Sequence, residues 1–539
     1  MNKKSVKFYA IGAVVIIGVV LLFVFRKNIF SGTKEKLFNL LHYKQMVTVK
    51  GDTEHINSRE LLEKYFNHFG YEAKWTDTSS AQRVYRDMLI EMLNQADSLG
   101  LNRADYHEDY VTKYDSLSHL PNFDMSEFES ENEVIFTDAA LSFLYHVAYG
   151  KEIPRIEFNG VKYDIDSSHI LNVLNDLLVH HDWRRTLDSI EPKTTQYLFL
   201  KNELNRMQTF ARNYPSLDSM NVSNLDSGKV IAVIKLKAFG FITDVLSYDS
   251  VSKQQLKSAI VSFQRMMSID TLGTLDTKTI TALNYPVSNR LAQLKESLNY
   301  WRWTGRLREQ EFILVNIPAA RLQIVKQDTV KDMSMRVIVG KVNTKTPSFT
   351  AYITRVITYP YWTVPMGIAT KEMLPKIRKR ISYLDDNNLQ VINNKGVEVN
   401  PQQVDWNRYS EKYFPFTIRQ STGCDNSLGL IKFDLNSPFS IYLHDTNRRD
   451  LFGKKERFMS HGCVRVEKPM ELANYILGEG LDTSTVAKLQ QCLKDQKPQD
   501  FYLKKKFAVL ILYMTADVDE NMNLKFYGDV YAEAKKVIM

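Results

Sequence analysis

Cysteine is scarce in this chain of 539 residues: only Cys424, Cys463 and Cys492 occur, and the first 423 residues contain none. So few thiols cannot form a disulfide framework, and their odd number leaves at least one unpaired within the chain. The lack of a cysteine beside the apolar N-terminal segment also argues against a lipid-modified cysteine as an anchor. A free thiol is therefore available for chemistry.

Blocks of like charge are absent as well. The formal net charge is +8 and the pI about 8.9, with Lys and Arg spread along the whole sequence. This spread predicts a solvated surface, with at most mild affinity for anionic partners, and argues against nucleic-acid recognition. A charged fraction of 24% beside 44% hydrophobic residues is ordinary globular composition, and the length suffices for about three domains.

One long apolar run stands near the N-terminus. Phe8 to Phe25 contains no charged residue and is flanked by basic residues on both sides. As a helix it would be about 27 Å long, close to the roughly 30 Å of a hydrocarbon core. A cleavable signal peptide would have a shorter apolar run and small residues at its exit, whereas Phe23 and Phe25 stand there. We predict a cytoplasmic tail and uncleaved transmembrane anchor over 1–30 and a polar tether over 31–57.

Helical periodicity dominates the next half of the chain. Apolar residues at helical spacing between Leu61 and about Arg212 predict a helical domain over 58–225, in which His107 and His146 are packed or surface residues. Three further helices are predicted over 226–286. A connecting helix over 287–310 is indicated by one apolar stripe at i, i+4, i+7, i+11 and i+14, formed by Val287, Leu291, Leu294, Leu298 and Trp301.

The pattern then changes to short runs rich in Ile, Val and Tyr, typical of strands. It predicts a β-rich domain over 311–539, with strands near 312–317, 335–339, 439–443 and 507–513. Between about 365 and 416 the sequence becomes charged and rich in Asn. A segment of this length inside a β domain is usually functional or disordered, and we interpret it as a lid.

The chemistry concentrates in this last domain. Cys463 lies in the segment Ser460-His461-Gly462-Cys463-Val464-Arg465, nineteen residues (463 − 444) after His444. A free thiol is mostly protonated at neutral pH, so a nucleophilic cysteine needs a base within hydrogen-bond reach, and His444 and His461 are both candidates. Gly462 would let backbone N–H groups approach a reacting carbonyl, so the N–H groups of Gly462 and Cys463 are candidate donors to a developing oxyanion.

Two other interpretations of these residues stay open. Cysteine and histidine together are zinc ligands in many proteins, but a structural zinc site needs four such ligands, and only His444, Asp445 and Cys424 are nearby candidates. Cys463 would alternatively be a small buried hydrophobe, the commonest fate of a free cysteine. A Ser-His-Gly approach is, however, a poor way to fill an apolar core.

The segment 460–465, with Leu443-His444-Asp445 before it, resembles the L,D-transpeptidases with a YkuD-type catalytic domain, which cross-link peptidoglycan through a thioester. The likeness extends over 312–320, 335–341, 359–365 and 426–429. Segments 99–107 and 137–141 resemble the scaffold domain of the long, membrane-anchored members, and 226–286 resembles a three-helix peptidoglycan-binding domain. The resemblance implies a multidomain α+β protein: an N-terminal transmembrane helix, a helical scaffold, a small three-helix domain and a β-rich catalytic domain with a capping insertion.

The resemblance also implies site roles. Cys463 is expected to be the nucleophile and His444 the general base and acid, with His461 orienting or polarising and Gly462 donating its backbone N–H to an oxyanion. Expected substrate contacts are Tyr442, which alternates with His444 on one strand face, together with Trp362, Arg465 and Ser460. Arg465 would bind a carboxylate or brace the loop, and bracing is the first expectation. No metal or organic cofactor is implied.

The implied reaction is 3→3 cross-linking of two stem peptides, donor and acceptor, with release of D-alanine and with inhibition by carbapenems. Water as acceptor would make the enzyme an L,D-carboxypeptidase, and hydrolysis of existing cross-links would use the same residues. A non-catalytic wall-binding scaffold would keep the helices without needing Cys463. The expected location is the periplasmic side of the inner membrane, beside other wall-synthesis enzymes. Cys424 is left without an assigned role.

Overall fold

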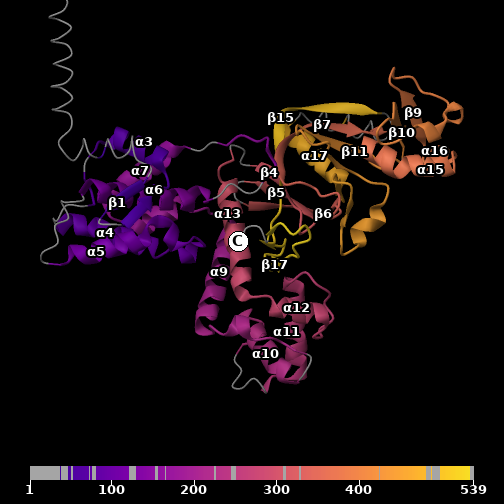
Figure 1. The fold of residues 1–539 in the computed structure, drawn as a ribbon. Helices are drawn as coiled ribbons and strands as arrows, with labels where there is room; N and C mark the ends of the chain where they lie inside the picture. Colours follow the sequence, from indigo (N-terminus) through magenta and orange to yellow (C-terminus); the bar gives the residue numbers. More distant parts are fainter. Residues whose placement is uncertain are drawn as a thin grey trace, which may run out of the picture. The chain divides into compact units, whose positions relative to one another are not determined.

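The computed structural model describes residues 46–49, 52–71, 73–75, 80–120, 129–151, 156–163, 166–223, 226–243, 250–307, 311–326, 329–423, 425–480 and 498–534, together with 37 and 487. Contacts divide the chain into two compact units (Figure 1). The first contains 1–152, 164–192 and 302–306, and the second contains 153–163, 193–301 and 307–539.

The first unit is helical, as the periodicity predicted. Its helices are α3 (Arg59–Phe69), α4 (Ser80–Leu93), α5 (Glu108–Ser118), α6 (Glu129–Tyr149), α7 (Ser167–His180) and α8 (Trp183–Ile190), with short 3-10 helices at Asp97–Leu99 and Arg103–Tyr106. Almost every side chain of α6 is buried, which explains why this helix is apolar around most of its circumference. It packs against α3, α5, α7 and α8 and forms the centre of the hydrophobic core.

The two histidines singled out in the sequence of this unit, His107 and His146, are packed residues. His107 Nε2 lies 2.8 Å from Asp138 Oδ2, and His146 Nδ1 lies 3.1 Å from the Tyr106 hydroxyl. Burial lowers the pKa of His146 to about 3, so its ring is neutral at physiological pH. The Asp138 carboxylate also accepts the backbone N–H groups of Asn57 and Ser58, which fixes the start of α3. These contacts give both histidines a structural explanation.

A small hairpin precedes α3. Strand β1 (Met46–Val49) pairs antiparallel with β2 (Asp52–His55). These residues fall in the segment predicted to be a tether, which therefore includes paired strands at 46–49 and 52–55. The apolar content of the segment is too low for the alternation of a strand to stand out in the sequence.

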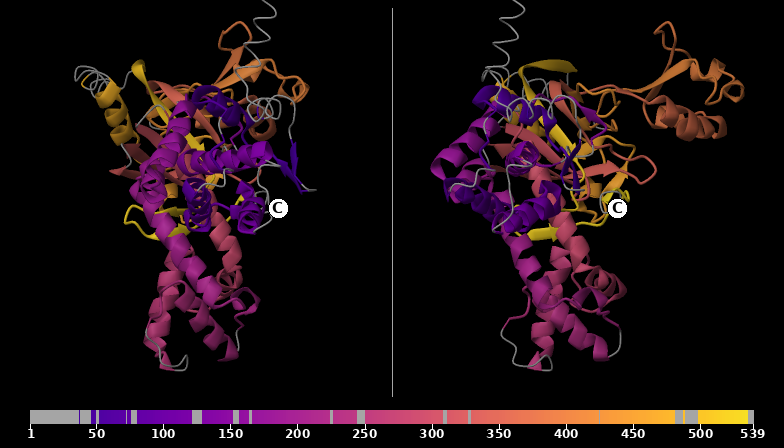
Figure 2. Two further views of the ribbon diagram at one scale, coloured as in Figure 1. Left: turned by 90° about the vertical axis from the view of Figure 1, so that its left-hand side faces the viewer. Right: turned by 60° about the vertical axis from the view of Figure 1, so that its left-hand side comes forward.

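The helices of the second unit are α9 (Thr195–Asn213), α10 (Asp226–Ala238), α11 (Lys253–Met266), α12 (Thr277–Asn284) and α13 (Val287–Thr304), with a 3-10 helix at Leu217–Ser219. The last residues of α13, 302–304, are grouped with the first unit. Helices α10 to α12 occupy the predicted three-helix segment (Figure 2). A capping box formed by Ser252 and Gln255 begins α11. Contacts place α9 in this unit, whereas the sequence pattern had assigned it to the helical domain ending at 225.

The catalytic candidates lie in a ten-stranded sheet. Its strands are β3 (Phe158–Asn159), β4 (Glu311–Asn316), β5 (Arg321–Lys326), β6 (Thr329–Gly340), β7 (Phe349–Thr358), β11 (Ile431–Leu435), β12 (Leu443–His444), β13 (Phe458–Ser460), β14 (Val464–Val466) and β15 (Gln499–Leu512). The order is β11-β12-β14-β6-β5-β4-β15-β7-β3, with β13 paired to β6 beside this path, and β11 also pairs with β7. This second pairing closes the sheet on itself around an apolar core that includes α17 (Pro469–Gly480).

The predicted lid is an ordered subdomain with its own core (Figure 2). It contains α14 (Met366–Ile368), a π-helix η6 (Ala369–Met373), α15 (Leu374–Lys379), α16 (Tyr383–Asp386), 3-10 helices at Pro401–Gln403 and Trp406–Arg408, and the sheet β8-β10-β9, formed by Trp362–Thr363, Phe416–Gln420 and Leu389–Asn393. We call residues 362–420 the cap. The remaining elements are a 3-10 helix at Arg449–Gly453 and the hairpin β16–β17, formed by Ala516–Val518 and Leu524–Phe526.

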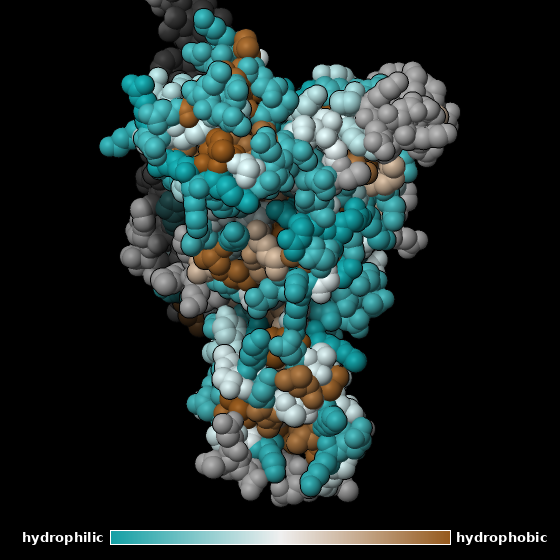
Figure 3. All heavy atoms as spheres, turned by 90° about the vertical axis from the view of Figure 1, so that its right-hand side faces the viewer, coloured by the Kyte–Doolittle hydropathy of each residue, from teal (hydrophilic) through white to brown (hydrophobic). Residues whose placement is uncertain are grey.

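The face in Figure 3 is mostly hydrophilic, with hydrophobic side chains in separate small groups. Within the described residues, we find no helix whose length and hydropathy would let it span a bilayer. The predicted anchor, Phe8 to Phe25, lies outside the described residues.

Gly429 packs closely against Asp445, the residue that follows His444. Gly429 has a φ of +61°, and a Cβ there would lie 2.4 Å from Asp445 Oδ2. The buried Asp445 carboxylate accepts the Leu430 N–H at 3.0 Å and pairs with Arg449 at 2.8 Å. The residue next to His444 is thus fixed by contacts that leave no room for a side chain at 429.

We therefore expect Gly429→Ala to lower the free energy of unfolding by about 1–3 kcal/mol from left-handed strain alone, with more from displacement of Asp445. Calorimetry of the full chain would show the transition of the second unit moving down by several degrees. Gly453→Ala is the matched control, because a Cβ at Gly453 meets nothing within 4 Å. Equal melting of both variants and the wild type would contradict this account.

Candidate active site

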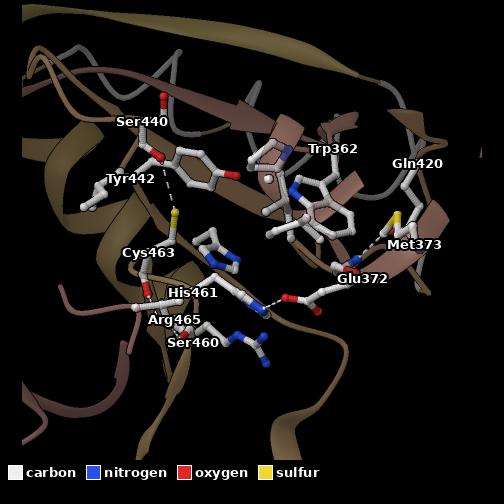
Figure 4. Close-up of a pocket in the computed structure, with 18 of the residues that line it drawn as sticks. Trp362, Glu372, Met373, Gln420, Ser440, Tyr442, Ser460, His461, Cys463 and Arg465 are labelled. Atoms are coloured by element: carbon white, nitrogen blue, oxygen red, sulfur yellow. Dashed lines mark hydrogen bonds and ion pairs between the residues drawn. The ribbon is translucent and has the colours of Figure 1, made fainter. Parts of the chain in front are cut away.

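Two neighbouring parallel strands bring the predicted residues together. In the register of β12 and β14, Leu443 pairs with Val464 and His444 with Arg465. Tyr442 and Cys463 immediately precede these strands, so Tyr442 and His444 share a face with Cys463 and Arg465. Diagonal neighbours on one face are about 7–8 Å apart, which long side chains can bridge. Cys463, His444, Tyr442 and Arg465 all line one cleft of about 1050 Å³ (Figure 4).

Cys463 is partly exposed to this cleft. Its Sγ lies 3.6 Å from the Ser440 carbonyl oxygen, to which the thiol donates (Figure 4). Burial raises the pKa of Cys463 above its ordinary value, while hydrogen bonds from the backbone and hydroxyl of Tyr442 act in the opposite direction. The resting sulfur is therefore a protonated thiol.

His444 is buried, and its tautomer follows from its partner. The ring Nδ1 lies 2.5 Å from the Asp445 carbonyl oxygen, which can only accept, so Nδ1 carries the proton. The other ring nitrogen, Nε2, then has a free lone pair. Burial lowers the pKa of His444 to about 3, with a further contribution from the positive charge of Arg465. The ring is thus a neutral acceptor across the physiological range.

These two pKa shifts decide how the pair can react. A raised thiol pKa and a lowered imidazole pKa both oppose a preformed thiolate–imidazolium pair. The thiol must instead lose its proton as it attacks, with His444 Nε2 as the acceptor. This is general-base catalysis, and it requires the thiol to turn from Ser440 toward the ring when substrate enters.

The turn before Cys463 is held by Ser460. The Ser460 hydroxyl donates to the Cys463 carbonyl at 2.6 Å and accepts the Gly462 N–H at 3.1 Å. Gly462 has a φ of +117°, a conformation that favours glycine. In this structure the Gly462 N–H is therefore engaged within the turn, which differs from the predicted arrangement in which it faces an oxyanion. Ser460 likewise braces the turn from a buried position, although it was expected to contact substrate.

His461 contacts the cap. Its Nε2 lies 2.7 Å from Glu372 Oε1, and Figure 4 shows the two side chains meeting across the cleft. Glu372 belongs to the π-helix η6, and π-helices are frequent at functional sites. Since His461 Nε2 points to the cap, the ring connects the catalytic turn to the cap. The sequence pattern gave no indication of this pairing.

Two aromatic residues line the cleft beside the thiol, as predicted. The Tyr442 ring centre is 5.5 Å from that of His444 and 4.2 Å from Lys432 Nζ. Burial and the nearby Cys463 raise the pKa of Tyr442, and a hydrogen bond from Trp362 acts against this rise. Trp362 begins the cap at β8. Tyr442 therefore stays neutral and can donate its hydroxyl proton within the cleft.

Arg465 lies beside His444 on β14. Its Nη1 is 3.5 Å from the Thr446 hydroxyl, and its buried Nε has no hydrogen-bond partner among the described residues. Burial lowers the pKa of Arg465, and the side chain lines the cleft. The long contact with Thr446 agrees poorly with the role of Arg465 in bracing the loop. It leaves N–H donors of the guanidinium available to a substrate carboxylate.

Metal ligation has no visible basis in the part of the chain that the structure describes. Within it, no three His, Cys, Asp or Glu side chains are grouped as metal ligands. Asp445, a candidate zinc ligand in the sequence, is occupied by Leu430 and Arg449. Cys424 and Cys492 lie outside the described residues, so Cys424 stays without an assigned role.

Comparison with known proteins agrees with this geometry. Residues 310–492 match the family model described as the L,D-transpeptidase catalytic domain, YkuD. The chain therefore contains a YkuD-type L,D-transpeptidase catalytic domain. Residues 60–204 match the model described as the Scaffold domain. The β-rich part of the second unit is thus the L,D-transpeptidase domain, and the helices before it include a scaffold domain.

A curated Haemophilus influenzae protein, whose name assigns it provisionally to the L,D-transpeptidases, is 34% identical over 225 residues. The match covers 42% of this chain and 45% of that protein, so the chain spans about half the length of its relative.

Two solved structures share the family name. An L,D-transpeptidase from Stackebrandtia nassauensis is 12% identical with a TM-score of 0.21, covering 54% of this chain and 94% of that one. A mutant L,D-transpeptidase from Enterococcus faecium is 11% identical with a TM-score of 0.17, covering 40% and 62%. At these TM-scores neither likeness carries weight for this chain.

The neutral state of the two side chains predicts a pH profile. We expect alkylation of Cys463 by iodoacetamide to accelerate steadily from pH 5 to above pH 9, without a plateau between pH 5 and 8, because the thiol pKa is raised and His444 stays unprotonated down to about pH 3. Peptide mapping would separate Cys463 from the other thiols.

The control is His444→Gln, which should leave this profile nearly unchanged, since iodoacetamide reacts with the small thiolate fraction. A plateau with a midpoint below pH 7 in the wild type, lost in the variant, would instead demonstrate a thiolate–imidazolium pair.

Proposed function

We propose that this protein is a peptidoglycan L,D-transpeptidase that forms 3→3 cross-links through a thioester on Cys463. The observation that carries the proposal is the placement of a thiol and a neutral, correctly protonated imidazole on one face of β12 and β14, in a cleft of about 1050 Å³. The YkuD match over 310–492 supports the same reaction class.

The first half-reaction is acylation. As the Cys463 Sγ bonds to the carbonyl carbon of the third stem-peptide residue, its proton moves to His444 Nε2 and the carbonyl electron pair moves to oxygen. Collapse of this tetrahedral intermediate breaks the bond to the terminal D-alanine. The leaving nitrogen takes the proton from His444, and a thioester is left on Cys463.

The second half-reaction transfers the acyl group. The side-chain amine of another stem peptide attacks the thioester carbonyl and gives a proton to His444 Nε2. The C–S bond breaks, the proton returns to the sulfur, and an amide joins the third residues of two stems. His444 thus acts as base and then acid in both halves, which only a neutral ring with a free Nε2 can do.

The charges that line the cleft suit this substrate. The cap contributes Lys371, Lys376 and Glu372, and the sheet contributes Arg465 with its unpartnered Nε. Stem peptides carry carboxylates, which match the cations, and the acceptor carries an amine, which matches Glu372. A cleft of this volume admits more than one peptide segment.

The proposed location is the outer face of the cytoplasmic membrane. It is supported by the apolar run Phe8 to Phe25 and by the peptidoglycan substrate, which lies outside the cell. We also propose that helices α10 to α12 support the catalytic domain within the wall and that other wall-synthesis enzymes work nearby.

The decisive test is product analysis on purified muropeptides with tetrapeptide stems. We expect the wild type to release D-alanine and to form 3→3 dimers, and Cys463→Ala and His444→Gln to lose at least 10³-fold in rate, because each removes a group that takes part in bond making. Tripeptide monomers without dimers would identify an L,D-carboxypeptidase instead. Loss of existing dimers would identify a cross-link hydrolase, and unchanged cross-linking by Cys463→Ala would indicate a scaffold.

The anchor is tested by fractionation. We expect the full chain to sediment with membranes and to resist extraction by high salt, because a span of this length is held by apolar burial and not by charge. A variant lacking residues 1–30 should appear in the soluble fraction with the same activity. Salt-extractable full-length protein would contradict an integral anchor.

A further inference from the structure

The turn before Cys463, residues 460–462, is hydrogen-bonded to a loop that the sequence analysis did not single out. Residues 341–348 connect β6 to β7, and we call them the bracing loop. Two of its side chains reach the turn: the Thr344 hydroxyl donates to the Ser460 carbonyl at 3.0 Å, and the Thr346 hydroxyl donates to the Gly462 carbonyl at 2.7 Å. The loop therefore holds the carbonyl groups on either side of His461.

The hydrogen bonds from Thr344 and Thr346 differ in whether the carbonyl group that accepts them has a second donor. The Ser460 carbonyl also accepts the Lys341 N–H at 3.0 Å, so it keeps a partner without Thr344. For the Gly462 carbonyl, the Thr346 hydroxyl is the one hydrogen-bond donor found among the described residues. Thr346 is 1% exposed and does not line the cleft, whereas Lys345 and Pro347 on either side of it do.

The direction of the Thr346 hydroxyl is unambiguous. Its oxygen accepts the Gly340 N–H at 2.9 Å, and that group can only donate. The hydroxyl hydrogen is then committed to the Gly462 carbonyl, which can only accept. The loop itself is fixed by Tyr531, whose hydroxyl donates to the Gly340 carbonyl at 2.5 Å and accepts the Thr346 N–H at 3.4 Å.

The hydrogen bond from Thr346 also fixes the orientation of the peptide group that joins Gly462 to Cys463. In a planar trans peptide the carbonyl and the following N–H point in opposite directions. Holding the Gly462 carbonyl toward Thr346 therefore turns the Cys463 N–H to the other side. This N–H has no acceptor among the described residues, while the neighbouring Gly462 N–H is taken by Ser460.

We propose that Thr346 is a positioning residue that aims the Cys463 N–H at the oxyanion of the tetrahedral intermediate, acting through the Gly462 carbonyl. The inference rests on the proposed acyl transfer and adds a residue to it. Thr346 touches neither substrate nor sulfur. It sets the plane of one peptide group, and Gly462, with its φ of +117°, has no Cβ to resist rotation of that plane once the hydroxyl is gone.

The test compares two reactions of the same sulfur. Acylation by a carbapenem such as meropenem passes through an oxyanion, whereas alkylation by iodoacetamide does not. We expect Thr346→Val to slow acylation at least tenfold, since loss of an oxyanion donor typically costs 10²–10³ in rate, and to leave alkylation within twofold. Thr346→Ser, which keeps the hydroxyl, should stay within threefold in both reactions.

Thr350→Val is the matched control. Thr350 is fully buried on β7, donates to Asn159 at 2.8 Å and accepts the Gly160 N–H at 3.1 Å, but it does not line the cleft. It should leave both rates within twofold. Both reactions are followed by intact mass and peptide mapping of the full chain.

Acylation of Thr346→Val at the wild-type rate would overturn the inference, and so would an equal fall in both rates, which would indicate general disturbance of the turn. If the valine variant does not fold, the serine variant decides: a folded Thr346→Ser that loses tenfold or more in acylation contradicts a role for the hydroxyl. A wild type that reacts with iodoacetamide but with neither meropenem nor a stem peptide would refute the proposed function itself, and the inference with it.

Discussion

The parallel pairing of β12 with β14 is the constraint on which the site depends. It places the strand that carries His444 beside the strand that begins after Cys463, in a register that puts their side chains on one face. That register holds because the sheet closes through β11 and because Asp445 is fixed against Gly429 and Leu430. The pairing of the two strands positions both His444 and Cys463, and the spacing between the strands sets the distance between the two residues.

Burial then determines the chemistry of the pair. Desolvation disfavours the charged forms of Cys463 and His444, so the resting site contains a neutral thiol and a neutral imidazole. Charge then separates only after substrate has bound. The charge that develops must be met by hydrogen-bonding groups that are already in place. The Asp445 carbonyl on the imidazole and the braced Cys463 peptide group meet this need from fixed backbone.

The sequence predicted what depends on local pattern and on motif. The stripe from Val287 to Trp301 predicted α13, because its period is a property of neighbouring residues. The spacing of His444 and Cys463 predicted that they share a site. The pairs Glu372–His461 and Thr346–Gly462 join residues 89 and 116 positions apart, so no local pattern reports them. The direction of the Gly462 N–H depends on the φ angle of one residue, which the sequence does not show. The strands at 46–49 and 52–55 were not predicted because their sequence is too polar to show an apolar alternation.

The π-helix of the cap has a consequence for how this protein can vary. A helix advances by about 100° per residue, so the single extra residue that widens η6 decides which side chain faces the catalytic turn. Glu372 meets His461, while its neighbours Lys371 and Met373 line other parts of the same cleft. Removing one residue anywhere between 366 and 371 would shift the register of the helix and move Glu372 out of its place opposite His461. The contact between the cap and the catalytic turn therefore depends on the number of residues in this segment as well as on the carboxylate of Glu372.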